Sequence, residues 1–167
     1  MGICATELRE FVIRPTLEHL DSYSLAAENL LLATAAQESG LGFHLRQDSG
    51  ERKGLGIYQI NEDLHNDIWD NYLALDADLA STVRGIASQH DFLKQPHAEL
   101  ATNLTYSTAI AWLIYRRANV VLPSDCNMMA LADCWLKFYP TIQENPSAEH
   151  FTSNVKFFIG PETGIAA

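Results

Sequence analysis

The sequence is poor in the residues that cross-link or interrupt a chain. Its three cysteines, Cys4, Cys126 and Cys134, are an odd number without paired spacing, which argues against a disulfide framework. We expect all three to be reduced thiols in or near the core. Nine glycines and six prolines among 167 residues make long flexible linkers unexpected. These absences favour a single domain that spans residues 1–167.

Positive charge is scarce as well. Eleven Lys and Arg stand against 21 Asp and Glu, which gives a formal net charge of −10 at pH 7. This balance opposes nucleic acid as a partner, because a phosphate backbone attracts a basic stripe. It also weighs against an enzyme of bacterial cell walls, since those polymers are anionic and long-range attraction would be missing.

Long apolar runs and metal-binding motifs are absent too. The longest apolar run, around Leu30 to Ala36, is too short to cross a bilayer, so we expect no membrane insertion. The N-terminus lacks a basic segment followed by an apolar one, so we expect no signal peptide and synthesis in the cytoplasm. No His-Glu-x-x-His or Cys-x-x-Cys spacing occurs, and we predict neither a metal nor another cofactor.

Helical periodicity fills most of the chain. Thr6 is predicted to cap a short helix that ends near Ile13, and Pro15 to begin the next one. Ser24 is a good N-cap for a helix that ends at Gly40. That helix is apolar nearly all round, which predicts a place at the centre of the domain.

Later helices are predicted from caps and apolar stripes. Asn61, Asp76 and Ser124 are expected N-caps, and a last helix is expected from Ser147 to about Phe158. The stripe that follows Asn61 is predicted to comprise Leu64, Ile68, Tyr72 and Leu75. The aromatic side chains on such stripes are predicted to lie in the core; they are Trp69, Tyr72, Trp112 and Trp135.

A run of acidic residues from Glu62 to Asp78 is predicted to be a solvated face. The glycine-rich stretch at residues 40–60 is expected to be irregular or a small β segment, so the fold class is all-α, or α-dominant α+β.

The segment that points to chemistry is residues 31–61. Glu38 stands at the C-terminal end of the apolar helix and is followed by Ser39 and the glycine-rich loop. Leu31 and Ala35 share the helix face of Glu38, so burial and the negative end of the helix dipole should both raise its pKa. A carboxyl that stays protonated near neutral pH is what general-acid cleavage of a glycosidic bond requires.

Two stretches of this segment, AAQESGLG and GLGIYQI, resemble the first two motifs of goose-type lysozymes and soluble lytic transglycosylases. In those proteins a Glu-Ser pair ends a buried helix, and a Gly-Leu-x-Gln-Ile strand lines the cleft. The chain is more similar still to phage-encoded proteins of this lysozyme-like group, in which counterparts of TELREFVIRPTLEHL, HNDIWDNYL and a late aromatic-rich helix occur together. The resemblance covers residues 6 to about 151 and implies a lysozyme-like fold.

The resemblance also implies roles for individual residues. Glu38 would be the catalytic acid and later the base. Ser39 would shape the helix end beside the substrate, and Tyr58 and Gln59 would line the sugar cleft. The substrate would be the glycan strand of peptidoglycan, cut at the β-1,4 bond between N-acetylmuramic acid and N-acetylglucosamine.

The third family motif usually reads Ala-Tyr-Asn or Tyr-Tyr-Asn. Tyr139 matches its tyrosine, but Pro140 stands where the family has asparagine, so the far side of the cleft departs from the pattern. A transglycosylase works with one carboxylate, because the sugar's own 6-hydroxyl attacks and closes a 1,6-anhydro ring. A hydrolase needs a second carboxylate, for which Asp48 and Glu51 are candidates. We favour transglycosylation, and hydrolysis stays open.

A non-catalytic protein is the rival interpretation. A lysozyme-like fold can serve as a structural or interaction module, for example beside the virion proteins of a phage particle. The negative charge, Pro140 and the lack of a signal peptide favour this rival, whereas Glu38 with Ser39 favours an enzyme, which phage lysis or virion delivery would bring to the wall. A Glu38 that faces an open groove lined by Gln59 and Tyr139 supports the enzyme; a buried, occluded Glu38 supports the rival.

Overall fold

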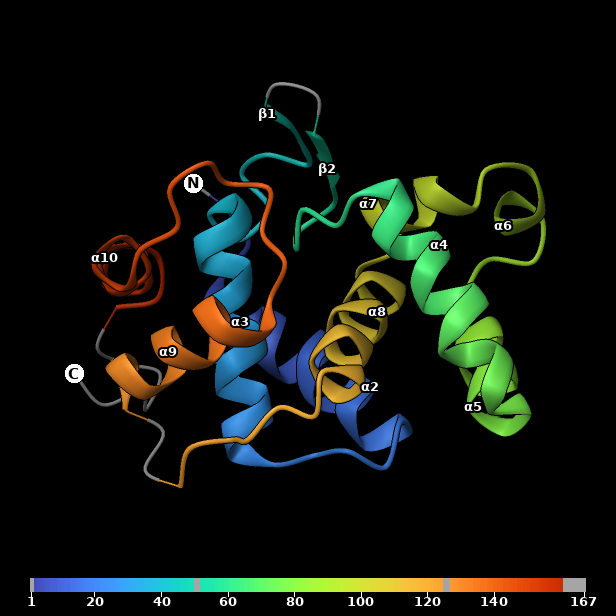
Figure 1. Ribbon diagram of the computed structural model, residues 1–167, viewed down its shortest axis with the longest axis horizontal. Helices are drawn as coiled ribbons and strands as arrows, with labels where there is room; N and C mark the ends of the chain where they lie inside the picture. Colours follow the sequence, from blue (N-terminus) through green and yellow to red (C-terminus); the bar gives the residue numbers. More distant parts are fainter. Residues whose placement is uncertain (1, 50–51, 125–126, 161–167) are drawn as a thin grey trace.

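Helices and one two-stranded hairpin make up the computed structural model, which describes residues 2–49, 52–124 and 127–160 (Figure 1). For residues 48, 49 and 52 only the backbone is described. The predicted α-dominant class is confirmed. The elements in chain order are α1 (Ala5–Leu8), η1 (Arg9–Ile13), α2 (Arg14–His19), α3 (Leu25–Ser39), β1 (Arg46–Ser49), β2 (Arg52–Leu55), α4 (Glu62–Asn71), η2 (Leu73–Leu75), α5 (Ala77–Ile86), α6 (Asp91–Lys94), η3 (Pro96–Ala98), α7 (Glu99–Thr102), α8 (Leu104–Arg117), α9 (Met128–Phe138) and α10 (Ala148–Phe158).

The first helical stretch runs through α1, the π-helical turn η1 and α2, with Pro15 in the first turn of α2. The predicted cap at Thr6 is wrong, because Ala5 already lies in the helix and Cys4 holds the N-cap position without a side-chain hydrogen bond. Burial of Ala5 and Leu8 accounts for the earlier start.

Helix α3 lies at the centre of the molecule, as its lack of a polar face predicts. Ser24 caps it through a hydrogen bond from the Ala27 N–H, and Gly40 ends it in the left-handed conformation at φ 61°. Every residue from Ala27 to Ser39 is buried. Helices α8, α9 and α10 all pack on α3, and α8 in turn contacts α4, α5 and α7 (Figure 1).

The other caps follow the sequence with one exception. The predicted caps at Asn61 and Asp76 are confirmed, since each side chain accepts the backbone N–H three residues on. Ser147, where the last helix was expected to begin, caps α10 in the same way. The predicted cap at Ser124 is wrong: Asn127 caps α9, its Oδ1 accepting from the Ala130 N–H at 2.8 Å. The stripe that was expected to reach Leu75 also stops early, because α4 ends at Asn71 and Leu75 is 83% exposed.

The β segment within residues 40–60 is confirmed and its position refined. Strands β1 and β2 pair antiparallel with Arg46 opposite Leu55, and the residues after Leu55 form a turn instead of a strand. Gly56 has φ 75°, and a Cβ there would meet the Leu100 carbonyl oxygen at 1.7 Å. At Gly54 a Cβ would meet the Gln59 side chain at 2.6 Å. The two glycines therefore let the turn fold back against the body of the protein.

The cysteine prediction is right for one residue and wrong for another. Cys134 is buried, whereas Cys4 is exposed, because the N-cap position of α1 lies at the surface. Cys126 lies outside the described residues. Within the part of the chain that the structure describes, no helix combines the length and the apolar character needed to cross a membrane.

Candidate functional site around Glu38

Glu38 lies in the last turn of α3 and is 1% exposed. Its Oε1 accepts a hydrogen bond from Trp135 Nε1 at 2.8 Å, and its Oε2 accepts one from Thr141 Oγ1 at 3.0 Å. Burial raises its pKa from 4.5 to about 7, and the two hydrogen bonds oppose this rise. Among the ion pairs found between described residues, none involves Glu38. The carboxyl is therefore held close to half protonation at neutral pH.

The two donors to Glu38 come from the same region of the chain. Trp135 is fully buried in α9, where its ring packs on Phe151 of α10 with centroids 5.3 Å apart. Thr141 follows α9 in residues 140–143, which we call the strap. The apolar stripe predicts Trp135 only as a core residue, and no sequence pattern predicts a role for Thr141. The only sequence signal for either was proximity to Tyr139 of the third motif.

Hydrogen bonds between amide side chains connect the strap to α3 and α10. Gln37 Nε2 donates to Gln143 Oε1 at 2.9 Å, and Gln143 Nε2 donates to the Gln37 carbonyl at 3.2 Å. Asn154 of α10 donates to Gln37 Oε1 at 2.9 Å, and the Gln143 N–H donates to Thr141 Oγ1 at 3.2 Å. This set of hydrogen bonds fixes the strap, and with it Thr141, over the end of α3.

Ser39 ties the end of α3 to the turn after β2. Its hydroxyl donates to the Ile57 carbonyl at 2.6 Å and accepts from the Gly42 N–H at 2.8 Å. Since Ser39 is 2% exposed and fully engaged, it shapes the helix end, as expected. Its predicted contact with substrate stays a prediction.

A hydrogen bond joins Tyr139 to Tyr58. Tyr139 Oη donates to the Tyr58 carbonyl at 2.7 Å, and Thr108 Oγ1 donates to Tyr58 Oη at 3.2 Å. Both tyrosines are buried, and burial raises the pKa of each hydroxyl. Tyr139 lines one of the two hollows described below, and Tyr58 lines neither of them. That the two tyrosines bind substrate stays a prediction.

Gln59 is held in a strained turn at φ 49°. Its Nε2 donates to the Gly56 carbonyl at 2.7 Å and to the His44 carbonyl at 3.2 Å. Its Oε1 is buried and has no hydrogen-bond partner among the described residues, although such a buried acceptor costs roughly 1–3 kcal/mol. Gln59 and Ile142 of the strap lie against the same side of Gly54. The strap thus contacts Glu38 through Thr141 and lies near Gln59 through Ile142.

A hollow of about 600 Å³ opens beside the strap, and we call it the hairpin hollow. It is lined by Arg46, Lys53, Asn61, Glu62, Asp63, Pro140 and Thr141. Thr141 touches both this hollow and the Glu38 carboxyl. Glu62 and Asp63, which the sequence analysis treated as part of a solvated face, are carboxylates on the wall of the hollow.

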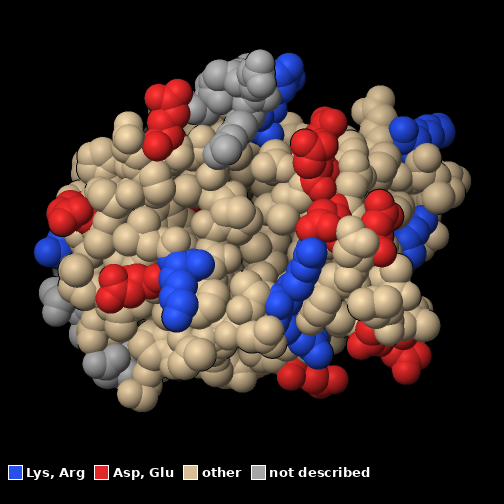
Figure 2. Space-filling model, in the orientation of Figure 1, with Lys and Arg blue, Asp and Glu red and all other residues tan. Residues whose placement is uncertain are grey.

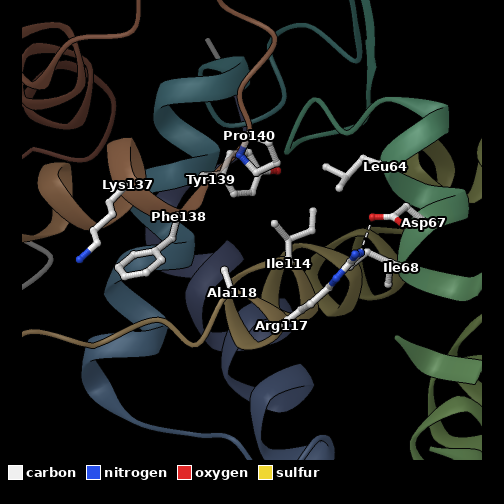
Figure 3. A pocket seen from close by; sticks show the side chains of 10 residues that line it. All are labelled: Leu64, Asp67, Ile68, Ile114, Arg117, Ala118, Lys137, Phe138, Tyr139 and Pro140. Carbon is white, nitrogen blue, oxygen red and sulfur yellow. Dashed lines mark hydrogen bonds and ion pairs between the residues drawn. The ribbon is translucent and has the colours of Figure 1, made fainter. Parts of the chain in front are cut away.

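A second hollow of about 340 Å³ lies between α4, α8 and α9, and we call it the interhelical hollow (Figure 3). Tyr139 lies at its upper end, and Pro140 lines both hollows. The proline that departs from the family motif therefore stands where the two hollows meet.

The predicted second carboxylates have no described side chain. Asp48 pairs with Lys53 across the hairpin, but only its backbone is described, and Glu51 lies outside the described residues. In the described part of the chain, no three His, Cys, Asp or Glu side chains gather as metal ligands do.

Comparisons of the chain with family models, with curated proteins and with solved structures found no significant match.

Proposed function

We propose that the chain is a lytic transglycosylase that cleaves the β-1,4 bond between N-acetylmuramic acid and N-acetylglucosamine, with Glu38 as the acid and then the base. The observation that supports this most is the environment of the Glu38 carboxyl. The group is buried, and its pKa is about 7. It accepts a hydrogen bond from Thr141, which lines the 600 Å³ hairpin hollow. A group whose pKa lies near the working pH can give and take a proton in one cycle.

The free energy that Glu38 costs the fold supports a functional role. Raising a carboxyl pKa from 4.5 to about 7 destabilises the native state by about 3 kcal/mol at neutral pH, because the unfolded chain ionises more easily. No ion pair among the described residues offsets this cost for Glu38. Strongly perturbed buried acids are concentrated at functional sites.

Each step of the reaction uses groups that this chain supplies. Protonated Glu38 gives its proton to the glycosidic oxygen, and the bond to the leaving sugar breaks. The Glu38 carboxylate then takes the proton of the muramic acid 6-hydroxyl as that oxygen attacks C1, which closes the 1,6-anhydro ring. Trp135 donates to the carboxylate while it is charged. For the sugar to reach Glu38, the Thr141 side chain has to turn away from it.

The same burial supports a second candidate. Glu38 is 1% exposed and both of its oxygens are engaged, which is the occluded arrangement that favours the non-catalytic rival. On this alternative the carboxyl joins α3, α9 and the strap internally. The chain then serves as a structural or interaction module, for example among phage virion proteins.

Digestion of purified peptidoglycan, with mass spectrometry of the products, tests the first proposal against the second. Glu38→Gln keeps the shape and removes the proton donor, so the rate should fall at least ~10²-fold. Glu149→Gln, on the exposed side of α10, is the matched control and should keep the wild-type rate. Products should end in 1,6-anhydro sugars, about 18 Da (one water) below hydrolytic products.

Two other outcomes have definite meanings. Reducing ends without anhydro ends would reassign the protein to the hydrolases, with Asp48, Glu62 and Asp63 as the carboxylates to replace next. A wild-type protein that is inert on walls of several compositions, with Glu38→Gln indistinguishable from it, would reject the transglycosylase and leave the non-catalytic module.

A further inference from the structure

The interhelical hollow has an apolar floor and a charged rim. Ile114 of α8, Ala118 directly after α8, and Ile68 of α4 form the floor. The Asp67–Arg117 ion pair lies on one side (Figure 3). Lys137 stands on the other side, with its ammonium directed outward. The volume of about 340 Å³ lies at the lower end of the range of small-molecule sites, ~300–1,000 Å³.

Arg117 can bind an anion without losing its partner. One guanidinium nitrogen donates to Asp67, and this hydrogen bond is the main reason that the Asp67 pKa is lowered. A guanidinium has five N–H donors in a planar fork. Within the described residues, Asp67 is the only side chain recorded as accepting from Arg117, and the Arg117 side chain is 35% exposed. Further donors are therefore available at the edge of the hollow.

Basic residues are concentrated at the two hollows, although the chain carries a net charge of −10. Four of its eleven Lys and Arg line them, namely Arg46, Lys53, Arg117 and Lys137. Figure 2 shows Lys and Arg side chains near the middle of the face that Figure 1 presents, with Asp and Glu beside them, and others at its top and edges. At the hairpin hollow two carboxylates, Glu62 and Asp63, balance the two basic residues. At the interhelical hollow Arg117 and Lys137 face the single carboxylate of Asp67, so an anionic group would meet a locally favourable surface there.

Apolar floor and guanidinium together fit a ligand that combines small apolar groups with a carboxylate. In the proposed substrate, the short peptide stem on the lactyl group of N-acetylmuramic acid has this chemistry. The stem branches from C3 of the sugar whose C1 reacts, so it needs a site close to the acid but separate from it. The interhelical hollow meets the hairpin hollow at Pro140 and satisfies that condition.

We propose that the interhelical hollow binds the peptide stem, with Arg117 holding a stem carboxylate, and that the protein therefore prefers peptide-bearing glycan to bare glycan. This inference rests on the proposed glycan substrate, but it does not require that the bond be cleaved. A sugar ring without a carboxylate would make no use of the guanidinium.

Titration calorimetry with two ligands tests the proposal. They are the disaccharide of N-acetylglucosamine and N-acetylmuramic acid with its stem peptide, and the same disaccharide without the stem and with its lactyl carboxyl converted to an amide, so that it carries no carboxylate. The wild-type protein should bind the first at least tenfold more tightly, the scale of a charge-assisted hydrogen bond. The preference should weaken as salt rises from 50 to 500 mM, concentrations that span Debye lengths from roughly 14 to 4 Å.

Three variants test whether Arg117 causes the preference for the peptide-bearing disaccharide. Arg117→Gln should reduce it to less than threefold, while Arg116→Gln, an exposed neighbour that does not line the hollow, should keep it. Asp67→Asn removes the competing carboxylate, so the preference should stay or increase. An increase is a result that general unfolding cannot produce.

Several results would overturn the proposal. They are equal binding of the two ligands by the wild type, an unchanged preference in Arg117→Gln, an equal loss in Arg116→Gln, or a loss in Asp67→Asn. The outcome is separable from that of the proposed function. A stem preference in a protein whose Glu38→Gln variant is catalytically indistinguishable would keep this site and reject the transglycosylase, and an active enzyme without the preference would do the reverse.

Discussion

Replacing Glu38 by Gln should stabilise the protein at neutral and alkaline pH. Gln has the shape of a protonated Glu, and its Oε1 can keep the hydrogen bond from Trp135. The Thr141 hydroxyl can turn from donor to acceptor and keep its contact with the new amide. The substitution therefore removes the cost of a buried ionisable group while retaining its packing, which makes the charge the main variable.

The magnitude follows from the pKa of Glu38. Its value is 4.5 in the unfolded chain and about 7 in the folded protein, so the folded state holds the proton more tightly. The contribution of Glu38 to the stability of the wild type is fully present below pH 4.5 and is lost as the pH rises through 7. At about 1.4 kcal/mol per pKa unit, this loss is about 3 kcal/mol at pH 8 and is close to zero at pH 4.

Another buried group titrates in the same interval with the opposite sign. Burial, with a smaller effect of His97, lowers the pKa of His65 from 6.5 to about 4. Its contribution is therefore present above pH 6.5 and is lost as the pH falls through 4. Because both proteins contain His65, the difference in unfolding free energy between Glu38→Gln and wild type cancels this contribution and isolates Glu38.

Urea unfolding of both proteins at pH 4, 6 and 8, followed by tryptophan fluorescence, measures this difference. Glu38→Gln should match the wild type at pH 4 and exceed it by about 3 kcal/mol at pH 8. For a chain of this length that corresponds to a melting temperature about 6–12 °C higher. A difference that stays the same from pH 4 to pH 8, or a variant less stable at pH 8, would refute the reasoning that the Glu38 carboxyl is buried with a raised pKa.

Two further predictions concern Ser39 and the cysteines. Ser39→Ala removes the hydroxyl that hydrogen-bonds to the Ile57 carbonyl and the Gly42 N–H. It should therefore lower the unfolding free energy by roughly 1–3 kcal/mol in urea titrations. If stability is unchanged while glycan binding is lost, Ser39 acts on substrate instead. In a thiol-reagent titration, exposed Cys4 should react in the native protein and buried Cys134 only after unfolding, because burial also raises the Cys134 pKa. Mass spectrometry of labelled peptides identifies the cysteine that reacts first, and the opposite order would contradict this interpretation.

The sequence alone determined the features that depend on near neighbours. The caps at Ser24, Asn61 and Asp76 form because a short polar side chain meets a backbone N–H three residues away, whatever the rest of the chain does. Gly40 ends α3 because glycine adopts positive φ without strain. The central place of α3 followed from its unbroken apolar surface. At α9 the local pattern predicted Ser124 as the cap, whereas Asn127 holds that position.

The tertiary structure decided the surroundings of Glu38. Its two hydrogen-bond donors, Trp135 and Thr141, lie 97 and 103 residues further along the chain, so no local pattern relates them to it. Motif residues expected to line an open cleft, Tyr58 and Gln59, are instead buried in the turn that Gly56 permits. Burial, and with it a pKa near 7, is a property of how α3, α9 and the strap pack together. The sequence could place a carboxyl at the end of an apolar helix, but only the packing of distant segments could remove it from water.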